Sequence, residues 1–265
     1  MRSVAGRIAR RTPGVARVVQ QRDELAARVE RLERRVANLT RPAREDLSFV
    51  FIVTYGRSGS TLLQGLLDSI PGWLIRGENA GSVYPLFQHH KLITERPQSR
   101  PRPTPTTARD PWFGLDGYPR QQALRELRAL VLDTLLRPEP DTRVTGFKEI
   151  RWQSPDLVDY LEFLRLLFPG ARFVFNTRDH EKVVASWQKK GGGWADRDRD
   201  AQLVEVARIE KLQLAAADAL GDAAYRVHFD DYVADVGALR GLFDWLGEEY
   251  DEPRLRAVME TQHSY

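Results

Sequence analysis

Apolar residues follow two different spacings along the chain, and each spacing occupies its own part of the sequence. In the first 46 residues the apolar positions alternate by four and three, at Leu25, Val29, Leu32, Val36 and Leu39. From residue 47 onward, short apolar runs alternate with segments in which apolar residues recur every three or four positions. The first spacing is typical of a helical seam, and the second of strands that alternate with helices. We therefore predict a helical arm over residues 1–46 and one domain over residues 47–265.

The alternation after residue 47 predicts an α/β fold, in which a P-loop-like parallel sheet is flanked by helices on both faces. Its strands are predicted where β-branched and aromatic residues gather, at 48–54, 144–148 and 172–177. With the arm included, the fold class is α/β with an N-terminal helical, coiled-coil-like extension.

Helices are predicted after each of these strands. The first follows residue 60 and presents one apolar face, formed by Leu62, Leu63, Leu66, Leu67 and Ile70. A second is predicted to start at Ser154, a favourable N-cap, with Pro155 at the first helical position. A third is predicted to start at Asp179.

Prolines are dense between Glu95 and Arg120, at positions 97, 101, 103, 105, 111 and 119. Proline has no backbone N–H to donate and restricts the residue before it, so this density excludes regular structure. We predict an exposed loop or lid over residues 95–120.

Charge is distributed unevenly along the chain. The formal net charge is +3, yet residues 1–46 hold 12 arginines against 6 acidic residues, which leaves a net −3 on the remainder. The basic character therefore belongs to the arm, and we expect no nucleic-acid partner for the domain.

Composition excludes several further classes of site. The absence of cysteine rules out disulfides, thiol nucleophiles and cysteine-ligated metals, and the five histidines have no ligand-like spacing, so no metal site is expected. No apolar run reaches 18 residues, and arginines are scattered through the first 20 residues, where a signal peptide would be apolar. The sequence thus predicts no transmembrane segment and a cytoplasmic location.

The arm places valine at the a positions and leucine at the d positions of its heptads, which favours a parallel dimer. Arg22 interrupts the seam one step earlier. A helix packed on its own domain is the alternative to a homodimer. A third possibility is binding to a lipid surface through Arg2, Arg7, Arg10 and Arg11.

The segment 55–61 (YGRSGST) joins the first predicted strand to the first helix. Such a turn, with Gly59 in it, directs backbone N–H groups and the positive end of the helix dipole at one spot, which predicts an anion site. Arg57 adds a full charge, and hydroxyls that can donate to phosphate oxygens come from Ser58, Ser60 and Thr61. An ordinary strand–helix connection is the alternative. The ATP-binding pattern G-x-x-x-x-G-K followed by Ser or Thr is absent.

This segment, extended to YGRSGSTLL, resembles the loop that grips the 5′-phosphate in sulfotransferases, which use 3′-phosphoadenosine-5′-phosphosulfate (PAPS) as donor. A second motif agrees with it. The strand ending at Thr177 is followed by Arg178, and Ser186 comes eight residues later, similar to the pair with which these enzymes hold the 3′-phosphate. The alternative is that Arg178 pairs with a carboxylate and Ser186 is only a small helical residue.

The resemblance extends over most of residues 47–265 and is closest to the bacterial carbohydrate-type and tyrosylprotein-type branches. The segment 75–79 (IRGEN) implies Glu78 as general base, and 146–151 (GFKEIR) implies that Lys148 contacts the transferred group. In 227–232 (VHFDDY), Phe229 stands where many members have tyrosine. The C-terminal glycine-rich loop of aryl sulfotransferases is absent. Alternative bases are His89, His90, His180 and His228.

The resemblance implies transfer of a sulfuryl group from PAPS to a hydroxyl of a carbohydrate, glycolipid or other small acceptor. Arg57 and Lys148 would supply the positive charge that Mg²⁺ supplies in kinases, so no metal is expected. The alternatives from other classes are a nucleotide-dependent kinase or NTPase and a catalytically silent coiled-coil scaffold.

Overall fold

A five-stranded parallel sheet with strand order β2-β3-β1-β4-β5 organises the domain. The structure is a computed structural model that describes residues 19–26, 28–29, 44, 46–99, 107–109, 113, 117–190 and 197–261. The chain divides into two compact units, Met1–Glu45 and Asp46–Tyr265. The strands are β1 Ser48–Val53, β2 Trp73–Arg76, β3 Val144–Glu149, β4 Arg172–Thr177 and β5 Ala224–His228.

Helices follow the strands in the order expected of an α/β fold. Their bounds are α3 Ser60–Asp68, α4 Tyr84–Ser99, α5 Arg120–Val131, α6 Leu157–Leu167, α7 His180–Lys190, α8 Arg199–Leu220, α9 Phe229–Ala234, α10 Arg240–Leu246 and α11 Glu252–Glu260. The predicted α/β class with a parallel sheet is confirmed, as are the three predicted strands, which are β1, β3 and β4.

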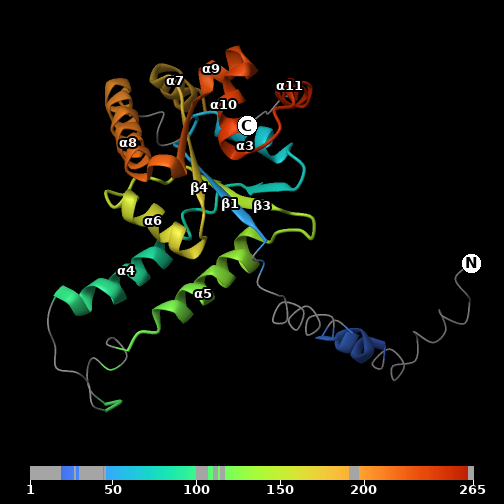
Figure 1. Ribbon diagram of the computed structural model, residues 1–265, viewed down its shortest axis with the longest axis vertical. Coiled ribbons are helices and arrows are strands. Elements are labelled where there is room, and N and C mark those ends of the chain that lie inside the picture. The colour runs from blue at the N-terminus through green and yellow to red at the C-terminus, as the bar shows by residue number, and fades with distance from the viewer. Residues whose placement is uncertain are drawn as a thin grey trace, which may run out of the picture. The chain divides into compact units, whose positions relative to one another are not determined.

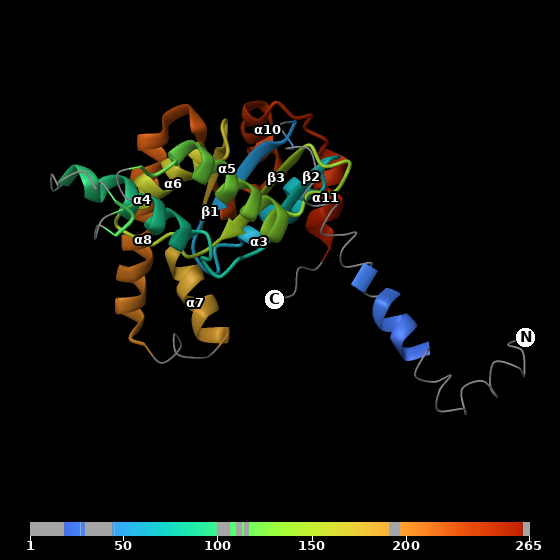
Figure 2. The same ribbon diagram turned by 90° about the horizontal axis from the view of Figure 1, so that it is seen from below.

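The central strand β1 separates two apolar cores because its side chains alternate between the two faces of the sheet. Phe49 and Phe51 belong to one core, which α4, α5, α6 and α8 cover, and Val50 and Ile52 belong to the other, which α3, α10 and α11 cover. Figure 1 and Figure 2 show these two groups of helices on opposite faces of the sheet. A strand buried on both faces explains why β1 reads as a continuous apolar run.

Two local predictions are wrong. Helix α6 begins at Leu157, with Asp156 at its N-cap, and not at Ser154 and Pro155. The Ser154 hydroxyl does not cap the helix, because it lies 2.7 Å from the hydroxyl of Tyr84 and also bonds Asp156. Helix α4 continues to Ser99 through Pro97, so the predicted loop does not start at residue 95. Proline so close to the end of a helix removes one backbone hydrogen bond and leaves the preceding turns intact.

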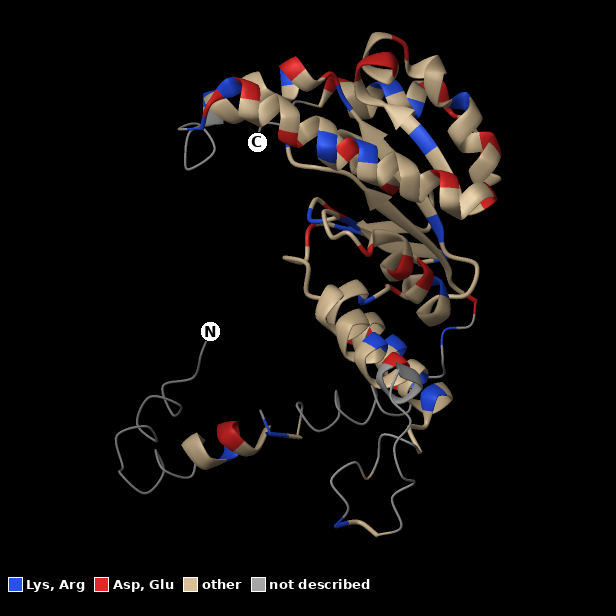
Figure 3. Ribbon diagram, turned by 90° about the vertical axis from the view of Figure 1, so that its left-hand side faces the viewer, with Lys and Arg blue, Asp and Glu red and all other residues tan. Residues whose placement is uncertain are grey.

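Several sequence predictions fall on residues that the structure does not describe. These include most of the proline-rich segment, with Pro101, Pro103, Pro105 and Pro111, and three of the five seam residues of the arm. Residues 19–26 and 28–29 of the arm are helical. In the described part of the chain, no helix is both long and apolar enough to cross a membrane. Lysine, arginine, aspartate and glutamate are interspersed over the helices of the domain (Figure 3).

Candidate active site

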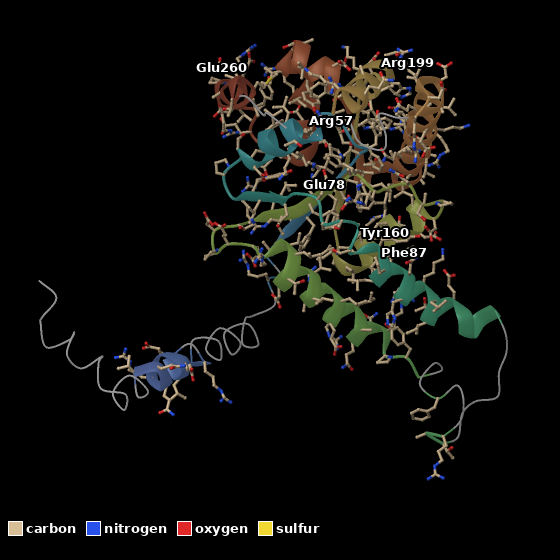
Figure 4. All side chains as sticks on the ribbon, turned by 180° about the vertical axis from the view of Figure 1, so that it is seen from behind. Arg57, Glu78, Phe87, Tyr160, Arg199 and Glu260 are labelled. Carbon is tan, nitrogen blue, oxygen red and sulfur yellow. The ribbon has the colours of Figure 1, made fainter. Side chains whose placement is uncertain are left out.

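A cleft of about 970 Å³ opens at the carboxyl ends of the strands, where parallel α/β sheets bind their ligands. It brings together most of the residues predicted from the sequence, namely Arg57, Gly59, Ser60, Thr61, Glu78, Lys148 and Arg178. Figure 4 labels Arg57 and Glu78, which come from the loops after β1 and β2. The far end of the cleft is formed by α3 and the end of α11, with Gln64, Asp68, Met259 and Thr261.

The loop after β1 is tightened by two residues with left-handed backbone, Arg57 at φ 67° and Gly59 at φ 79°. Helix α3 begins immediately afterwards at Ser60, and its buried leucines hold it against the sheet. The first N–H groups of a helix have no partner within the helix and carry the positive end of its dipole. Ser60 and Thr61 line the cleft, so this end of α3 opens into it, an arrangement that suits an anion.

Phe229, the first residue of α9, packs directly against the loop. A Cβ atom on Gly59 would lie 2.0 Å from Cδ2 of Phe229, so only glycine permits this approach. The guanidinium of Arg178 lies over the same ring, 4.5 Å from its centroid. The Phe229 ring therefore positions Arg178 without needing a hydroxyl group.

The hydroxyl of Ser58 is not presented to the cleft. Ser58 is fully buried, and its Oγ lies 2.6 Å from Oγ1 of Thr54. The carbonyl of Ser58 accepts a hydrogen bond from the Asn176 amide at 2.9 Å. Ser58 thus joins the loop to the ends of β1 and β4.

Arg57, Arg178 and Ser186 form one connected group, although they come from different elements. Nε of Arg57 donates to Oγ of Ser186 at 2.8 Å, and Nη1 of Arg178 donates to the carbonyl of Arg57 at 3.0 Å. Ser186 lies on α7, whose N-terminus is capped by Asp179 through a bond from the N–H of Lys182 at 2.9 Å. Ser186 itself is not part of the cleft lining and lies against Arg57.

Sequence reasoning missed Glu210 on α8, which is linked to Arg178 through the hydroxyl of Tyr55. The hydroxyl of Tyr55 donates to Oε2 of Glu210 at 2.5 Å and accepts from the backbone N–H of Arg178 at 3.0 Å. Burial, together with the bond to Glu210, raises the pKa of Tyr55 well above its usual value. Nε2 of His180 lies 3.2 Å from the same carboxylate oxygen. Glu210 is 155 residues from Tyr55, and no local pattern marks it.

Glu78 and Lys148 form an ion pair inside the cleft, with Lys148 Nζ 2.9 Å from Glu78 Oε1. The side chain of Lys148 is 7% exposed, whereas that of Glu78 is 38% exposed and can reach a ligand. Nη1 of Arg151 lies 3.8 Å from the other oxygen, Oε2. A carboxylate with this exposure can accept a hydrogen bond from a hydroxyl group of a ligand.

The four histidines considered as alternative bases do not line the cleft. His89 and His90 lie on α4, where His90 packs against Phe163 with ring centroids 5.3 Å apart. Burial lowers the pKa of His90. His180 contacts Glu210, and Nδ1 of His228 lies 2.9 Å from Oγ1 of Thr177. Of the candidates, only Glu78 faces the cleft.

Within the described residues, no group of three or more His, Asp or Glu could hold a metal ion.

Comparison with known proteins gives a family match and similar solved structures. A model of the sulfotransferase family matches residues 50–252. The structure is similar to the sulfotransferase domain from the curacin biosynthetic pathway, with a TM-score of 0.50 and 16% sequence identity over 79% of this chain and 76% of that one. It is also similar to sulfotransferase STF9 from Mycobacterium avium, with a TM-score of 0.48 and 14% sequence identity over 89% of this chain and 73% of that one. No curated protein sequence matches the chain.

Proposed function

The chain belongs to the sulfotransferase family, and we propose that it transfers a sulfuryl group from PAPS to a hydroxyl group of its acceptor. The observation that carries this proposal is the ion pair of Glu78 and Lys148, which lies in the same cleft as the anion-binding end of α3. One cleft then holds a base for the acceptor and positive charge for the donor.

The donor would bind along the loop after β1. The 5′-phosphosulfate would contact Arg57, Gly59, Ser60 and Thr61, which line the cleft. Arg178 and Ser186 would hold the 3′-phosphate. Nε of Arg178 is buried and has no hydrogen-bond partner in the described residues, and a phosphate oxygen would satisfy it.

The chemistry follows from these positions. Glu78 takes the proton of the acceptor hydroxyl as the new O–S bond forms and the S–O bond to the 5′-phosphate breaks. The products are a sulfate ester and 3′,5′-ADP. Negative charge grows on the departing phosphate oxygen, where Lys148 and Arg57 stabilise it. These cations take the part that Mg²⁺ takes in kinases, so the reaction is expected to need no metal ion.

The acceptor is proposed to be a carbohydrate, a glycolipid or another small hydroxyl compound. Glu78 is accessible from a wide cleft, and the segment that carries it resembles that of carbohydrate-type and tyrosylprotein-type enzymes. A kinase is less compatible with the loop, because Ser60 stands directly after the last glycine, where the ATP-binding pattern has lysine. A silent scaffold would not need the charged groups that the cleft gathers.

We also propose that the arm forms a homodimer. In its described part, residues 19–26 and 28–29 are helical, and the seam residues Leu25 and Val29 are 60% and 51% exposed. Apolar side chains at successive d and a positions of a helix are those that a second copy would cover.

Sulfuryl transfer is tested with the full chain and PAPS labelled in its sulfate group, offered to glycans, glycolipids and small alcohols, with and without EDTA. We expect labelled product and 3′,5′-ADP in equal amounts, unaffected by EDTA. Mg²⁺-dependent transfer of phosphate from ATP would contradict this proposal and favour the kinase alternative.

A further inference from the structure

Glu149, the residue next to Lys148 on β3, is a buried carboxylate that the chemistry above does not use. Its side chain is 4% exposed, and a buried charge is costly unless hydrogen bonds compensate it. Five donors do so: the backbone N–H groups of Asn79, Gly81, Ile150 and Arg151, at 3.1, 2.8, 2.8 and 3.2 Å, and Nη1 of Arg151 at 3.0 Å.

Two of these donors belong to the turn that carries Glu78. Asn79 and Gly81 both donate to Oε2 of Glu149. Between them, Ala80 has a left-handed backbone with φ 59°, and Gly81 follows at φ 71°. A left-handed conformation is strained for a residue other than glycine. The turn therefore needs support from outside itself, and Glu149 holds it on both sides of Ala80.

The other side of Glu78 is fixed separately. β2 is an edge strand, and the backbone N–H and carbonyl of Ile75 form hydrogen bonds with side chains of α3. The N–H of Ile75 donates to Oδ1 of Asp68 at 2.5 Å, and its carbonyl accepts from Nε2 of Gln64 at 2.7 Å. Glu78 lies between the two anchored points Ile75 and Asn79, and the Glu149 contacts fix the backbone that follows it.

Successive residues of β3 thus act on Glu78 in different ways. Lys148 contacts the carboxylate of Glu78, and Glu149 holds the backbone that follows Glu78. Glu149 also bonds Arg151, whose Nη1 lies 3.8 Å from Oε2 of Glu78. We propose that Glu149 is a positioning residue for Glu78, an inference that rests on the proposed function. Both of its oxygens only accept hydrogen bonds, so glutamine, which has nearly the same shape, would direct an NH₂ group at N–H donors.

A double-mutant cycle tests this role. Glu149→Gln, Glu78→Gln and the double variant are compared with wild type for kcat in sulfate transfer from PAPS and for Kd of 3′,5′-ADP. We expect Glu149→Gln to lower kcat by about 10–100-fold, since a shift on the order of 1 Å can have this effect, with Kd changed less than about threefold. In the Glu78→Gln background the same change should lower kcat by less than about threefold, because the base is already absent.

Glu248→Gln is the matched control. Glu248 is also a largely buried carboxylate, 11% exposed, bonded to Arg143 and Trp73 at the amino ends of β2 and β3, away from the cleft. The Glu248→Gln substitution should lower Tm and leave kcat unchanged. A kcat unchanged in Glu149→Gln, or an equal fold loss in both backgrounds, would overturn the proposal. If Glu149→Gln does not fold, Glu149→Asp keeps the acceptors and withdraws them by one methylene group.

Hydrogen exchange separates failure of this inference from failure of the proposed function. Backbone amides of residues 77–82 should exchange faster in Glu149→Gln than in wild type, and at the wild-type rate in Glu248→Gln. Unchanged exchange in Glu149→Gln overturns the positioning role whatever reaction the protein performs. Faster exchange in an enzyme that does not use PAPS would instead overturn the proposed function and, with it, the link to catalysis.

Discussion

Arg57 donates a hydrogen bond from Nε to Oγ of Ser186 at 2.8 Å, although the two residues are 129 positions apart. The bond joins the loop after β1 to α7, and the carbonyl of Arg57 accepts a further bond from Arg178. The residues proposed for the 5′-phosphosulfate and the 3′-phosphate are therefore built as one unit. A change in the loop is expected to weaken both ends of the donor site together.

Gly59→Ala tests this coupling, with Gly170→Ala as its control. Both glycines have left-handed backbone, at φ 79° and 77°, so backbone strain alone costs each variant about 1–2 kcal/mol of stability. A Cβ on Gly59 would collide with Phe229 and displace Arg178, whereas nothing lies within 4 Å of a Cβ on Gly170. Calorimetry should show 3′,5′-ADP binding weakened more than about tenfold in Gly59→Ala alone. Equal affinities in the two variants would disprove the coupling.

Asp68 gives a prediction in pH. Burial, opposed by the bond from the N–H of Ile75, raises its pKa to about 6. A carboxyl whose folded pKa is raised contributes stability below its unfolded pKa, about 4, and that contribution is lost as pH rises through about 6. Asp68→Asn keeps an acceptor for Ile75 and cannot ionise. The Tm of the variant minus that of wild type should therefore increase between pH 4 and pH 8. A constant difference would show that the shift is absent.

The strands and the motif positions could be predicted because they depend on local sequence. β1 and β4 are buried on both faces and read as apolar runs, and the charged residues follow directly at their ends. Side-chain direction within a loop has no such signal. The sequence therefore predicts a phosphate contact for Ser58, whereas its hydroxyl lies in the core beside Thr54.

Contacts distant in sequence decided the rest. Ser154 is a good cap by type, yet Tyr84, 70 residues away, takes its hydroxyl. Glu210 and Glu149 look like ordinary surface acids in the sequence. Their roles appear only when α8 is placed beside Tyr55 and the turn after β2 beside the end of β3.

Glu78→Gln should lower kcat by about 10²–10⁴-fold, as expected for a positioned general base, and leave the Kd of 3′,5′-ADP nearly unchanged. The amide keeps the shape of the side chain and cannot accept the proton of the acceptor. His89→Ala and His228→Ala are controls that should retain turnover, because neither residue lines the cleft. If Glu78→Gln retained turnover and one histidine variant abolished the acidic limb of the pH–rate profile, that histidine would be the base.

Deletion of residues 1–44 tests the arm. The deletion removes the heptads and none of the proposed donor ligands, so the mass in solution measured by light scattering should fall from that of a dimer to that of a monomer. Sulfate transfer should persist. An unchanged oligomeric state would favour the alternative of a helix packed on its own domain.

The use of PAPS is tested most directly by titrating the full chain with 3′,5′-ADP and with ATP, each with and without Mg²⁺. Without metal, 3′,5′-ADP should bind more tightly than ATP, because Arg178 and Ser186 recognise a 3′-phosphate that ATP lacks. Arg178→Ala should weaken 3′,5′-ADP by about 1.5–3 kcal/mol more than 5′-AMP, whereas Arg165→Ala, a surface arginine of α6 paired with Glu162, should change neither. Tighter binding of ATP with Mg²⁺, or equal losses for the two ligands in Arg178→Ala, would contradict a PAPS-dependent sulfotransferase.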